Sequence, residues 1–377
     1  MPASAPARAL LTLLAVCVQS FMLLQVGFFY ARLRWRHWGQ PPPPPAAMEA
    51  TPAGRGRSPG GSPARPGGGG GALRELGGEA GVLGAVISCV VMVRNEELNI
   101  RSTLRRLAGA AEHPGRLEVV VVDSGCTDGT IAAAEDEART LPFGVAFVRA
   151  AAAGRGSALD AGTVAARGDI IFVCHADCLV PRHFDGLIRR GMLKPTTLAT
   201  AFRFALNRAE LPAGEGGLPG AGVMEFTVNL RAKWLQLPFG DQGLAITKAR
   251  LTERYGGWGG AEYPLLEDFQ LVQKLRQDGA CGLGWIELIG EGGGLSSAAA
   301  EEAAGGGGAE GTLRCSPRRW RSLGVWRVNL VNQLVMLWFQ RGATPQQLFD
   351  FYYGIRTDHV PRWLATLTAP LMPKKQN

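Results

Sequence analysis

The sequence predicts an α/β fold built on a doubly wound, mostly parallel β-sheet. From residue 86 onward, continuous apolar runs of strand length alternate with segments of helical periodicity. A continuous apolar run is typical of a strand that is buried on both faces, as parallel strands are. The repeated strand–helix order and an apolar content of 46% favour a sheet that is covered by helices on both sides.

Four strands and three helices are predicted in the first half of this region. The strands are expected over residues 86–93, 118–122, 145–148 and 170–174. The first helix is expected to open at residues 95–97, with apolar residues at 100, 104 and 107, and the other two are expected over about 129–140 and 157–168. Thr127 or Asp128 is the expected N-terminal cap of the second helix, and Ser157 is the expected cap of the third.

The N-terminal part of the chain predicts a membrane anchor followed by a stalk. Residues 1–8 are a short tail, and residues 9–31 are an uncharged apolar run long enough for a transmembrane helix. A cleaved targeting peptide is the alternative. Residues 32–81 are rich in Pro and Gly, which predicts a disordered stalk. Beyond it we expect a main domain over 82–289, a low-complexity insertion over 290–311, a C-terminal helical part of the domain over 312–360 and a tail over 361–377.

The net charge of +8 is concentrated near the N-terminus, because residues 1–80 contribute +5 of it. This distribution fits a lipid bilayer as a partner, and we expect no nucleic-acid partner, since no basic stripe is interleaved with aromatic residues. Arg32, Arg34 and Arg36 follow the apolar run, which slightly favours the cytosolic face over the Golgi lumen. The seven cysteines include no CxxC pair and are expected to be buried, reduced thiols.

Polar clusters follow three of the predicted strands, at residues 95–96, 123–124 and 175–177. Ligands of doubly wound sheets bind beyond the carboxyl ends of the strands, so these clusters predict a ligand site. Carboxylates at 96–97 stand where a dinucleotide-binding fold has its glycine motif, and they would repel a pyrophosphate. A P-loop is absent. Residues 154–157 are the one Gly-rich candidate for a phosphate, and an ordinary turn is the alternative.

Six longer segments occur in a recognisable order. They are "ISCVVMVRNEELNIRSTLRRL", "EVVVVDSGCTDGT", "GRGSALDAGTVAARGDIIFVCHADC", "FGDQGLAITKARLTERYGGW", "PLLEDFQLVQKLRQDG" and "CSPRRWRSLGVW". Together they resemble family 2 glycosyltransferases, which have the GT-A fold. The "HAD" and "GDQG" segments are most similar to the branch that includes enzymes of arsenosugar biosynthesis. The resemblance implies an inverting glycosyltransferase that moves a sugar from a nucleotide-diphosphate sugar, with a UDP-sugar favoured, to an acceptor hydroxyl.

The resemblance also implies a donor site. Its residues would be Asn95, Glu96, Asp123, Asp128, Arg155 and Gly156. The first three would surround the nucleotide base and ribose, because a carboxylate accepts hydrogen bonds from base N–H groups and ribose hydroxyls. Asp128 either fixes the turn that presents Asp123 or caps the following helix. Arg155 either reaches the ribose or a phosphate or lies in solvent.

A metal site and a catalytic site follow from the same resemblance. Asp177 matches the last carboxylate of the family's DxD-like motif, with His175 in place of the first, which implies a Mn²⁺ or Mg²⁺ cofactor. Glu267 and Asp268 match the ED motif, with Asp268 as the general base and a helix cap as the alternative. The acceptor or diphosphate side would hold Gly240, Asp241, Gln242, Arg319 and Trp320, and the choice between Arg319 and its neighbour Arg318 stays open.

Two other classes of function compete with this interpretation. A catalytically silent, membrane-anchored module that binds a nucleotide sugar or glycan would keep the fold without turnover, but the retained Asp123, Asp177 and Asp268 oppose it. A nucleotidyltransferase would need a Gly-rich phosphate loop directly after the first strand, and that loop is missing. The sequence identifies no acceptor.

Overall fold

The computed structural model describes residues 71–211, 218–290 and 311–353, together with five isolated helical residues between 17 and 31. The predicted anchor therefore lies almost entirely outside the described residues, as do most of the predicted stalk, residues 291–310 of the insertion and the C-terminal tail. Within the described residues, no helix is long and apolar enough to cross a membrane.

The folded domain begins earlier than residue 82. Two short helices, α2 (Ala72–Glu75) and α3 (Glu79–Gly84), lie in the segment that was predicted to end a disordered stalk. They are held to the domain because Ala72 is fully buried, and because the amide of Gly71 donates to the carbonyl of Pro195 at 3.0 Å. Burial of their apolar side chains therefore makes this segment part of the folded domain despite the surrounding glycines.

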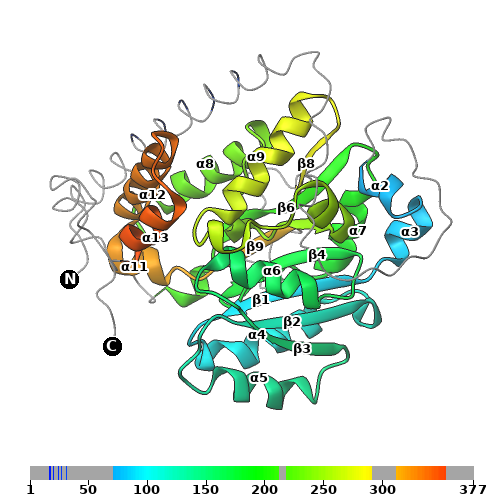
Figure 1. Ribbon diagram of the computed structural model, residues 1–377. Coiled ribbons are helices and arrows are strands. Elements are labelled where there is room, and N and C mark those ends of the chain that lie inside the picture. The colour runs from blue at the N-terminus through cyan, green and yellow to red at the C-terminus, as the bar shows by residue number, and fades with distance from the viewer. Residues whose placement is uncertain are drawn as a thin grey trace, which may run out of the picture.

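The predicted strand–helix alternation is present (Figure 1). Its strands are β1 (Ile87–Val93), β2 (Leu117–Asp123), β3 (Gly144–Arg149), β4 (Ile170–His175), β5 (Cys178–Leu179), β6 (Thr197–Leu206), β7 (Ala245–Thr247), β8 (Trp285–Ile289) and β9 (Thr312–Cys315). Its helices after α3 are α4 (Glu97–Ala110), α5 (Thr130–Ala138), α6 (Arg155–Ala165), α7 (Phe184–Met192), α8 (Ala221–Trp234), α9 (Glu267–Ala280), α11 (Arg318–Leu323), α12 (Val325–Gln340) and α13 (Pro345–Tyr352). Short single turns lie between them at Pro114–Arg116, Arg208–Glu210, Gly240–Gln242, Arg250–Arg254 and Gly260–Glu262.

In the described residues the strands form one mixed sheet in the order β3-β2-β1-β4-β7-β6-β9-β5, with β8 also paired to β6. The first four strands are parallel, as the sequence predicts. Beyond β4 the prediction of a mostly parallel sheet is incomplete, because β7 runs antiparallel to both β4 and β6, and β5 runs antiparallel to β9. The antiparallel strands β5 and β7 have only two and three residues, which is too short to leave a continuous apolar run in the sequence.

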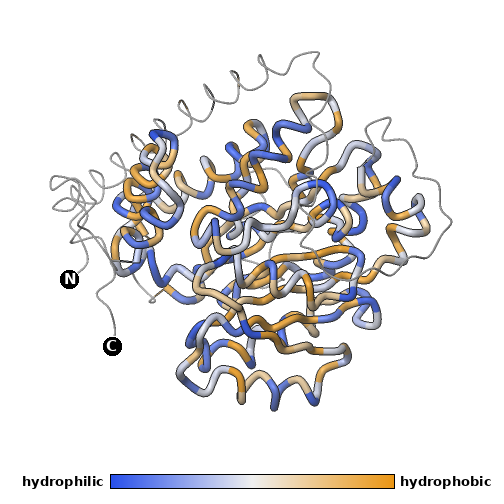
Figure 2. The backbone as a smooth tube through the Cα atoms, in the orientation of Figure 1, coloured by the Kyte–Doolittle hydropathy of each residue, from blue (hydrophilic) through white to orange (hydrophobic). Residues whose placement is uncertain are grey.

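The sheet buries both faces, and alternate residues of β1 show it. Cys89 and Val91 pack with α4, α5 and α7 on one face, and Val90 packs with α6 and α9 on the other. Figure 2 shows hydrophobic residues along these central strands. A third, smaller core joins α12 and α13 to the loop before α9 through Leu265. The C-terminal helices are thus attached to the side of the domain on which the carboxyl ends of the strands lie.

Candidate active site

The loops after β1 and β2 are interlocked. Asn95 has a left-handed backbone (φ 57°), and its Oδ1 accepts from the amide of Thr127 at 2.8 Å. The amide of Glu96 donates to Oγ1 of Thr130 at 2.8 Å. The side chain of Asn95 therefore holds the β2 loop in place, and its carbonyl oxygen already has an amide partner within the chain.

Asp123 stands at the end of β2 with one oxygen engaged. Its Oδ1 accepts from the amides of Cys126 at 2.7 Å and Gly125 at 2.9 Å, and its Oδ2 lies 3.9 Å from Nε of Arg149. The hydrogen bond from Cys126 is the main cause that lowers the pKa of Asp123, so the group is an ionised carboxylate. Asp128 accepts from the amide of Thr130 at 3.1 Å, which is the contact expected of a residue that fixes the start of α5.

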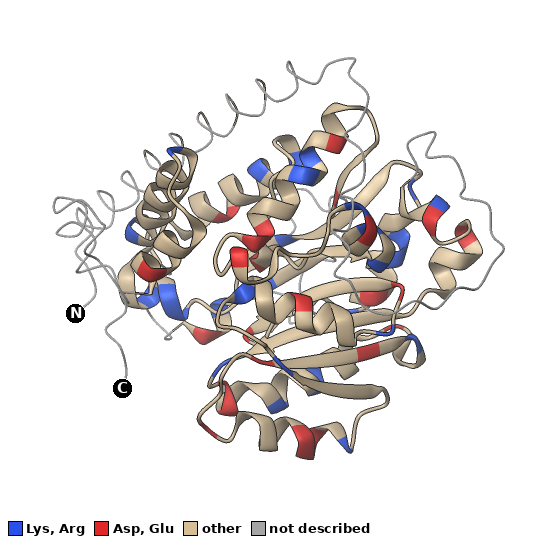
Figure 3. Cartoon of the chain, viewed as in Figure 1, with Lys and Arg blue, Asp and Glu red and all other residues tan. Residues whose placement is uncertain are grey.

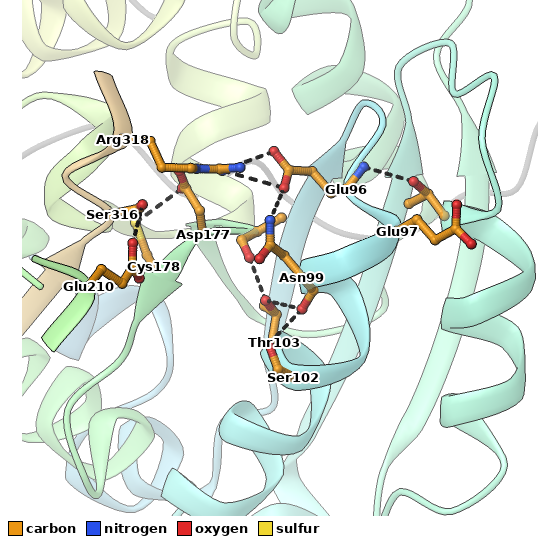
Figure 4. A network of polar contacts seen from close by, with 12 residues as sticks. Glu96, Glu97, Asn99, Ser102, Thr103, Asp177, Cys178, Glu210, Ser316 and Arg318 are labelled. Atoms are coloured by element: carbon orange, nitrogen blue, oxygen red, sulfur yellow. Dashed lines mark hydrogen bonds and ion pairs between the residues drawn. The ribbon is translucent and has the colours of Figure 1, made fainter. Parts of the chain in front are cut away.

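Arg318, at the start of α11, joins the ends of two separate strands. Its Nη2 lies 3.0 Å from Oδ2 of Asp177 and 3.2 Å from Oε1 of Glu96 (Figure 4). The guanidinium of Arg319 lies instead over the ring of Tyr352, 4.4 Å from its centroid. Sequence reasoning left the choice between the two arginines open, and the structure brings Arg318 to the carboxylates.

Trp320 packs away from these charges. Its ring centroid is 6.0 Å from that of Phe204, which makes it part of the seam between α11 and β6. Its indole nitrogen is buried and has no hydrogen-bond partner among the described residues.

A second cluster centres on Arg155, the first residue of α6. Its Nε donates to Oε1 of Glu267 at 2.5 Å, and its Nη2 lies 3.3 Å from Nε2 of His175. A guanidinium only donates hydrogen bonds, so Nε2 of His175 is the acceptor and its proton is on Nδ1. Burial, followed by the charge of Arg155, lowers the pKa of His175 to about 4. His175 is therefore a neutral imidazole near neutral pH.

Glu267 is fully buried, and only one of its oxygens has a partner. Oε1 takes the hydrogen bond from Arg155, and Oε2 has no partner among the described residues. Burial raises the pKa of Glu267 to about 7, with Arg155 acting in the opposite direction. Glu267 therefore positions Arg155 and lies too deep to meet a bound substrate directly.

Asp268 is hydrogen-bonded to Gly240, and Arg155 and His175 lie beside the same glycine. Oδ2 of Asp268 accepts from the amide of Gly240 at 2.6 Å, and Oδ1 accepts from the amide of Phe269 at 2.7 Å. A Cβ atom on Gly240 would lie 2.9 Å from Nη2 of Arg155, 3.0 Å from Oδ2 of Asp268 and 3.6 Å from Nε2 of His175. The three polar side chains thus converge on a position that has room only for glycine.

The two residues after Gly240 differ in whether their side-chain polar atoms have hydrogen-bond partners. Gln242 is fully buried, and its amide donates to the carbonyl of Phe202 at 3.1 Å, which is a structural contact. Asp241 keeps Oδ1 buried without a partner in the described chain, and burial, opposed by Arg231, raises its pKa to about 6. Arg231 itself is buried, with its guanidinium 3.9 Å from the ring centroid of Phe239. The sequence gives no local signal that Arg231 belongs to this cluster, because it lies inside α8 among residues with an ordinary helical pattern.

The Gly-rich segment before α6 is a packing seam. The amides of Arg155 and Gly156 donate to the carbonyls of Pro264 at 3.1 Å and Tyr263 at 3.2 Å. These amides are used within the chain, so they do not form a phosphate cradle. Ser157 lies inside α6, not at its cap as predicted, because the helix begins at Arg155 after Gly154, whose positive φ (112°) interrupts the preceding chain.

Comparison with known proteins decides the class of the protein. Residues 88–256 match the model of the family described as glycosyl transferase family 2. This match identifies the protein as a glycosyltransferase. The matched residues include the ends of β1, β2 and β4, the start of α6 and the Gly240 loop, whereas Glu267, Asp268 and Arg318 lie outside the matched range. The chain matches no protein among the curated sequences.

Two solved glycosyltransferases illustrate the structural similarity. Glucosyl-3-phosphoglycerate synthase from Mycobacterium tuberculosis, in complex with Mn²⁺, UDP and phosphoglyceric acid, is 22% identical over 60% of this chain and 74% of its own, with a TM-score of 0.38. A mannosyltransferase from Pyrobaculum calidifontis, in complex with GDP-Man and Mn²⁺, is 17% identical over 96% of both chains, with a TM-score of 0.41. These values are too low to transfer residue roles to this glycosyltransferase.

Few protein ligands are available in the glycosyltransferase for a metal ion. No group of three or more His, Cys, Asp or Glu side chains is placed to hold one within residues 71–211, 218–290 and 311–353. Asp177 supplies one carboxylate, and it already attracts a cation, the guanidinium of Arg318. Mg²⁺ usually takes one or two protein carboxylates together with substrate phosphates and water, so the site fits a metal that binds with a diphosphate. Figure 3 shows acidic residues at the start of α9 and basic residues at the start of α6, the two helix starts that the ion pair between Arg155 and Glu267 joins.

Proposed function

We propose that this glycosyltransferase has the GT-A fold and inverts the anomeric centre as it transfers a sugar from a nucleoside diphosphate sugar to an acceptor hydroxyl. One observation supports the proposal above the others. Arg155, His175 and Asp268 converge at Gly240, beside strand ends that carry Asp123 and Asp177. Donor groups and a candidate base thus share one edge of the sheet, where ligands of such sheets bind.

The donor nucleotide would bind at the ends of β1 and β2. Oδ1 of Asp123 accepts from two backbone amides, whereas Oδ2 lies 3.9 Å from Nε of Arg149. It can accept the N–H of a uracil ring, so a UDP-sugar is the donor that we propose. Arg318 lies between Glu96 and Asp177, where it can turn from these carboxylates to the negatively charged diphosphate.

Mn²⁺ or Mg²⁺ at Asp177 would supply the positive charge that offsets the negative charge gathering on the leaving diphosphate. The neutral His175 adds no charge of its own beside Asp177. Arg155 keeps its guanidinium fixed by Glu267, so a permanent positive charge remains at the same edge of the sheet.

Asp268 is the proposed general base. Its two oxygens are oriented by the amides of Gly240 and Phe269, and each oxygen keeps a second lone pair. In the reaction, the acceptor oxygen forms a bond to the anomeric carbon as the bond to the diphosphate breaks. The proton of the acceptor hydroxyl passes to Asp268.

The "HAD" and "GDQG" segments support placing the enzyme in the branch that includes arsenosugar-biosynthesis proteins.

Two substitutions test this assignment. Asp268→Asn keeps the size of the side chain and removes its basicity, so turnover should fall by roughly 10²–10⁴-fold while donor binding changes little. Asp177→Ala should weaken donor binding that depends on Mn²⁺ as well as turnover. Near-normal transfer by Asp268→Asn would make Asp268 a helix-terminal anchor for Gly240 and would refute its role as base. A catalytically silent binding module would bind UDP but release none from a UDP-sugar.

A further inference from the structure

Two cysteines face each other at the far edge of the sheet. β5 and β9 are antiparallel, and Cys178 stands directly opposite Cys315. Both thiols are buried, and their Sγ atoms are 3.0 Å apart. Directly opposed residues of antiparallel strands have Cα atoms about 4.5–5.5 Å apart, which lies inside the range of about 4.4–6.8 Å found for disulfides.

We propose that Cys178 and Cys315 form a reversible disulfide that clamps β5, which closely follows β4, to the segment that carries Arg318. An S–S bond is about 2.05 Å long, so the two sulfurs need to approach by only about 1 Å. Cys174, the nearest competing thiol in sequence, has its Sγ 3.5 Å from the carbonyl oxygen of His175. The strand pairing therefore favours Cys315 over Cys174 as the disulfide partner of Cys178.

The bond requires an oxidant, and a small-molecule disulfide such as oxidised glutathione has the right chemistry. The thiolate of one cysteine attacks a glutathione sulfur and releases one reduced glutathione. The thiolate of the second cysteine then attacks the cysteine sulfur of this mixed disulfide and releases the second glutathione. The two thiols lose two protons and two electrons, and both electrons pass to the glutathione disulfide. Because the pair is buried, the exchange is expected during folding or when β9 opens locally.

The clamp would act on the proposed metal carboxylate and on its arginine partner. Cys178 directly follows Asp177, and Cys315 lies shortly before Arg318, so the cross-link spans the same gap as the ion pair between those two side chains. It also closes a loop of 137 residues, since β9 follows the low-complexity insertion in the chain. Long loops gain the most stabilisation from cross-linking in the chain-entropy model. The inference does not depend on the proposed reaction, because thiol state and stability are both measurable without a substrate.

The first experiment maps the thiols of the full-length chain. Protein equilibrated in oxidised or reduced glutathione buffer is quenched with acid, unfolded, alkylated and digested for mass spectrometry. We expect a linked pair of peptides carrying Cys178 and Cys315 in the oxidised sample, and two alkylated cysteines in the reduced sample. Full alkylation of both residues after oxidation, or a link from either of them to Cys174, would overturn the proposal.

The second experiment measures what the bond does. The oxidised wild-type protein should melt about 5–10 °C above the reduced protein, as a long-loop disulfide in a domain of this size should. Amide hydrogen exchange in β9 and α11 should be slower after oxidation, whereas exchange in β1 and β2 should not change. Equal melting temperatures and equal exchange in the two states would refute the clamp. This comparison uses one sequence, so it decides the matter even if a cysteine variant does not fold.

Variants then assign the effect to the pair. Cys178→Ser and Cys315→Ser should each abolish the difference between the oxidised and reduced melting temperatures. Cys281→Ser removes a half-buried thiol at the end of α9 and serves as the matched control, which should keep the full difference. A difference that persists in Cys315→Ser would mean that another pair is responsible.

Discussion

Replacing Glu267 with glutamine should change how the stability of the protein depends on pH. Burial raises the pKa of Glu267 from the ordinary 4.5 to about 7, so the folded chain binds this proton more tightly than the unfolded chain does. The stabilisation from protonating Glu267 is therefore complete below about pH 4.5 and is lost as the pH rises to about 7. At about 1.36 kcal/mol per pKa unit, a shift of this size corresponds to about 3 kcal/mol. The opposing charge of Arg155, 2.5 Å from the carboxylate, is already included in this pKa.

Urea unfolding at pH 4.5 and pH 7 measures the effect. Between these pH values the wild-type protein should lose up to about 3 kcal/mol more unfolding free energy than Glu267→Gln, which cannot ionise. Glu135→Gln, on the exposed side of α5, is the matched control and should follow the wild-type protein. If the wild-type protein and Glu267→Gln change in parallel, Glu267 ionises at its ordinary pH and its burial does not raise its pKa.

Four further perturbations test other parts of the structure. Asp185→Ala removes a buried carboxylate that accepts from Arg189 at 2.8 Å. It should lower the unfolding free energy in urea by about 3–5 kcal/mol. A loss below about 1 kcal/mol would show that Arg189 finds another partner. Gly156→Ala places a methyl group 2.5 Å from the carbonyl oxygens of Gly260 and Tyr263, so it should destabilise the protein by about 1–3 kcal/mol in the same assay. Gly115→Ala is the control, because a methyl group there meets open space, and it should not destabilise the protein. Deleting residues 292–308 should leave the melting temperature nearly unchanged, and a loss of several degrees would show that this tract packs on the domain. Protease treatment of sealed vesicles should digest the catalytic domain if it lies on the cytosolic face, and protection would place it in the lumen.

The first half of the sheet could be predicted from the sequence because its strands are continuous apolar runs. The run predicted over residues 86–93 is β1 (Ile87–Val93), and the run predicted over 170–174 is β4 (Ile170–His175). Parallel pairing then places Asp123 beside Val93 and Arg149, which is why polar residues at strand ends converge. The register of parallel strands is therefore enough to predict that the polar residues at the ends of β1 and β2 lie together.

The remaining site could not be predicted because its contacts join distant parts of the chain. Arg155 and Glu267 are 112 residues apart, and Arg318 and Glu96 are 222 residues apart. Periodicity and capping patterns report only on neighbours in sequence, so neither pair leaves a local signal. The antiparallel strands β5 and β7 have two and three residues, too few for a recognisable apolar pattern. Their placement depends on packing against β4, β6 and β9.

Release of UDP from a UDP-sugar tests the central claim most directly. The full-length protein is incubated with a panel of UDP- and GDP-sugars, with Mn²⁺ or with a chelator, and the free nucleoside diphosphate is measured over time. The proposed function predicts release from at least one UDP-sugar that requires Mn²⁺, is lost in Asp177→Ala and falls by roughly 10²–10⁴-fold in Asp268→Asn. Release from GDP-sugars alone would correct the donor but keep the reaction. No release from any nucleotide sugar, or release that Asp177→Ala leaves unchanged, would contradict the proposed active site.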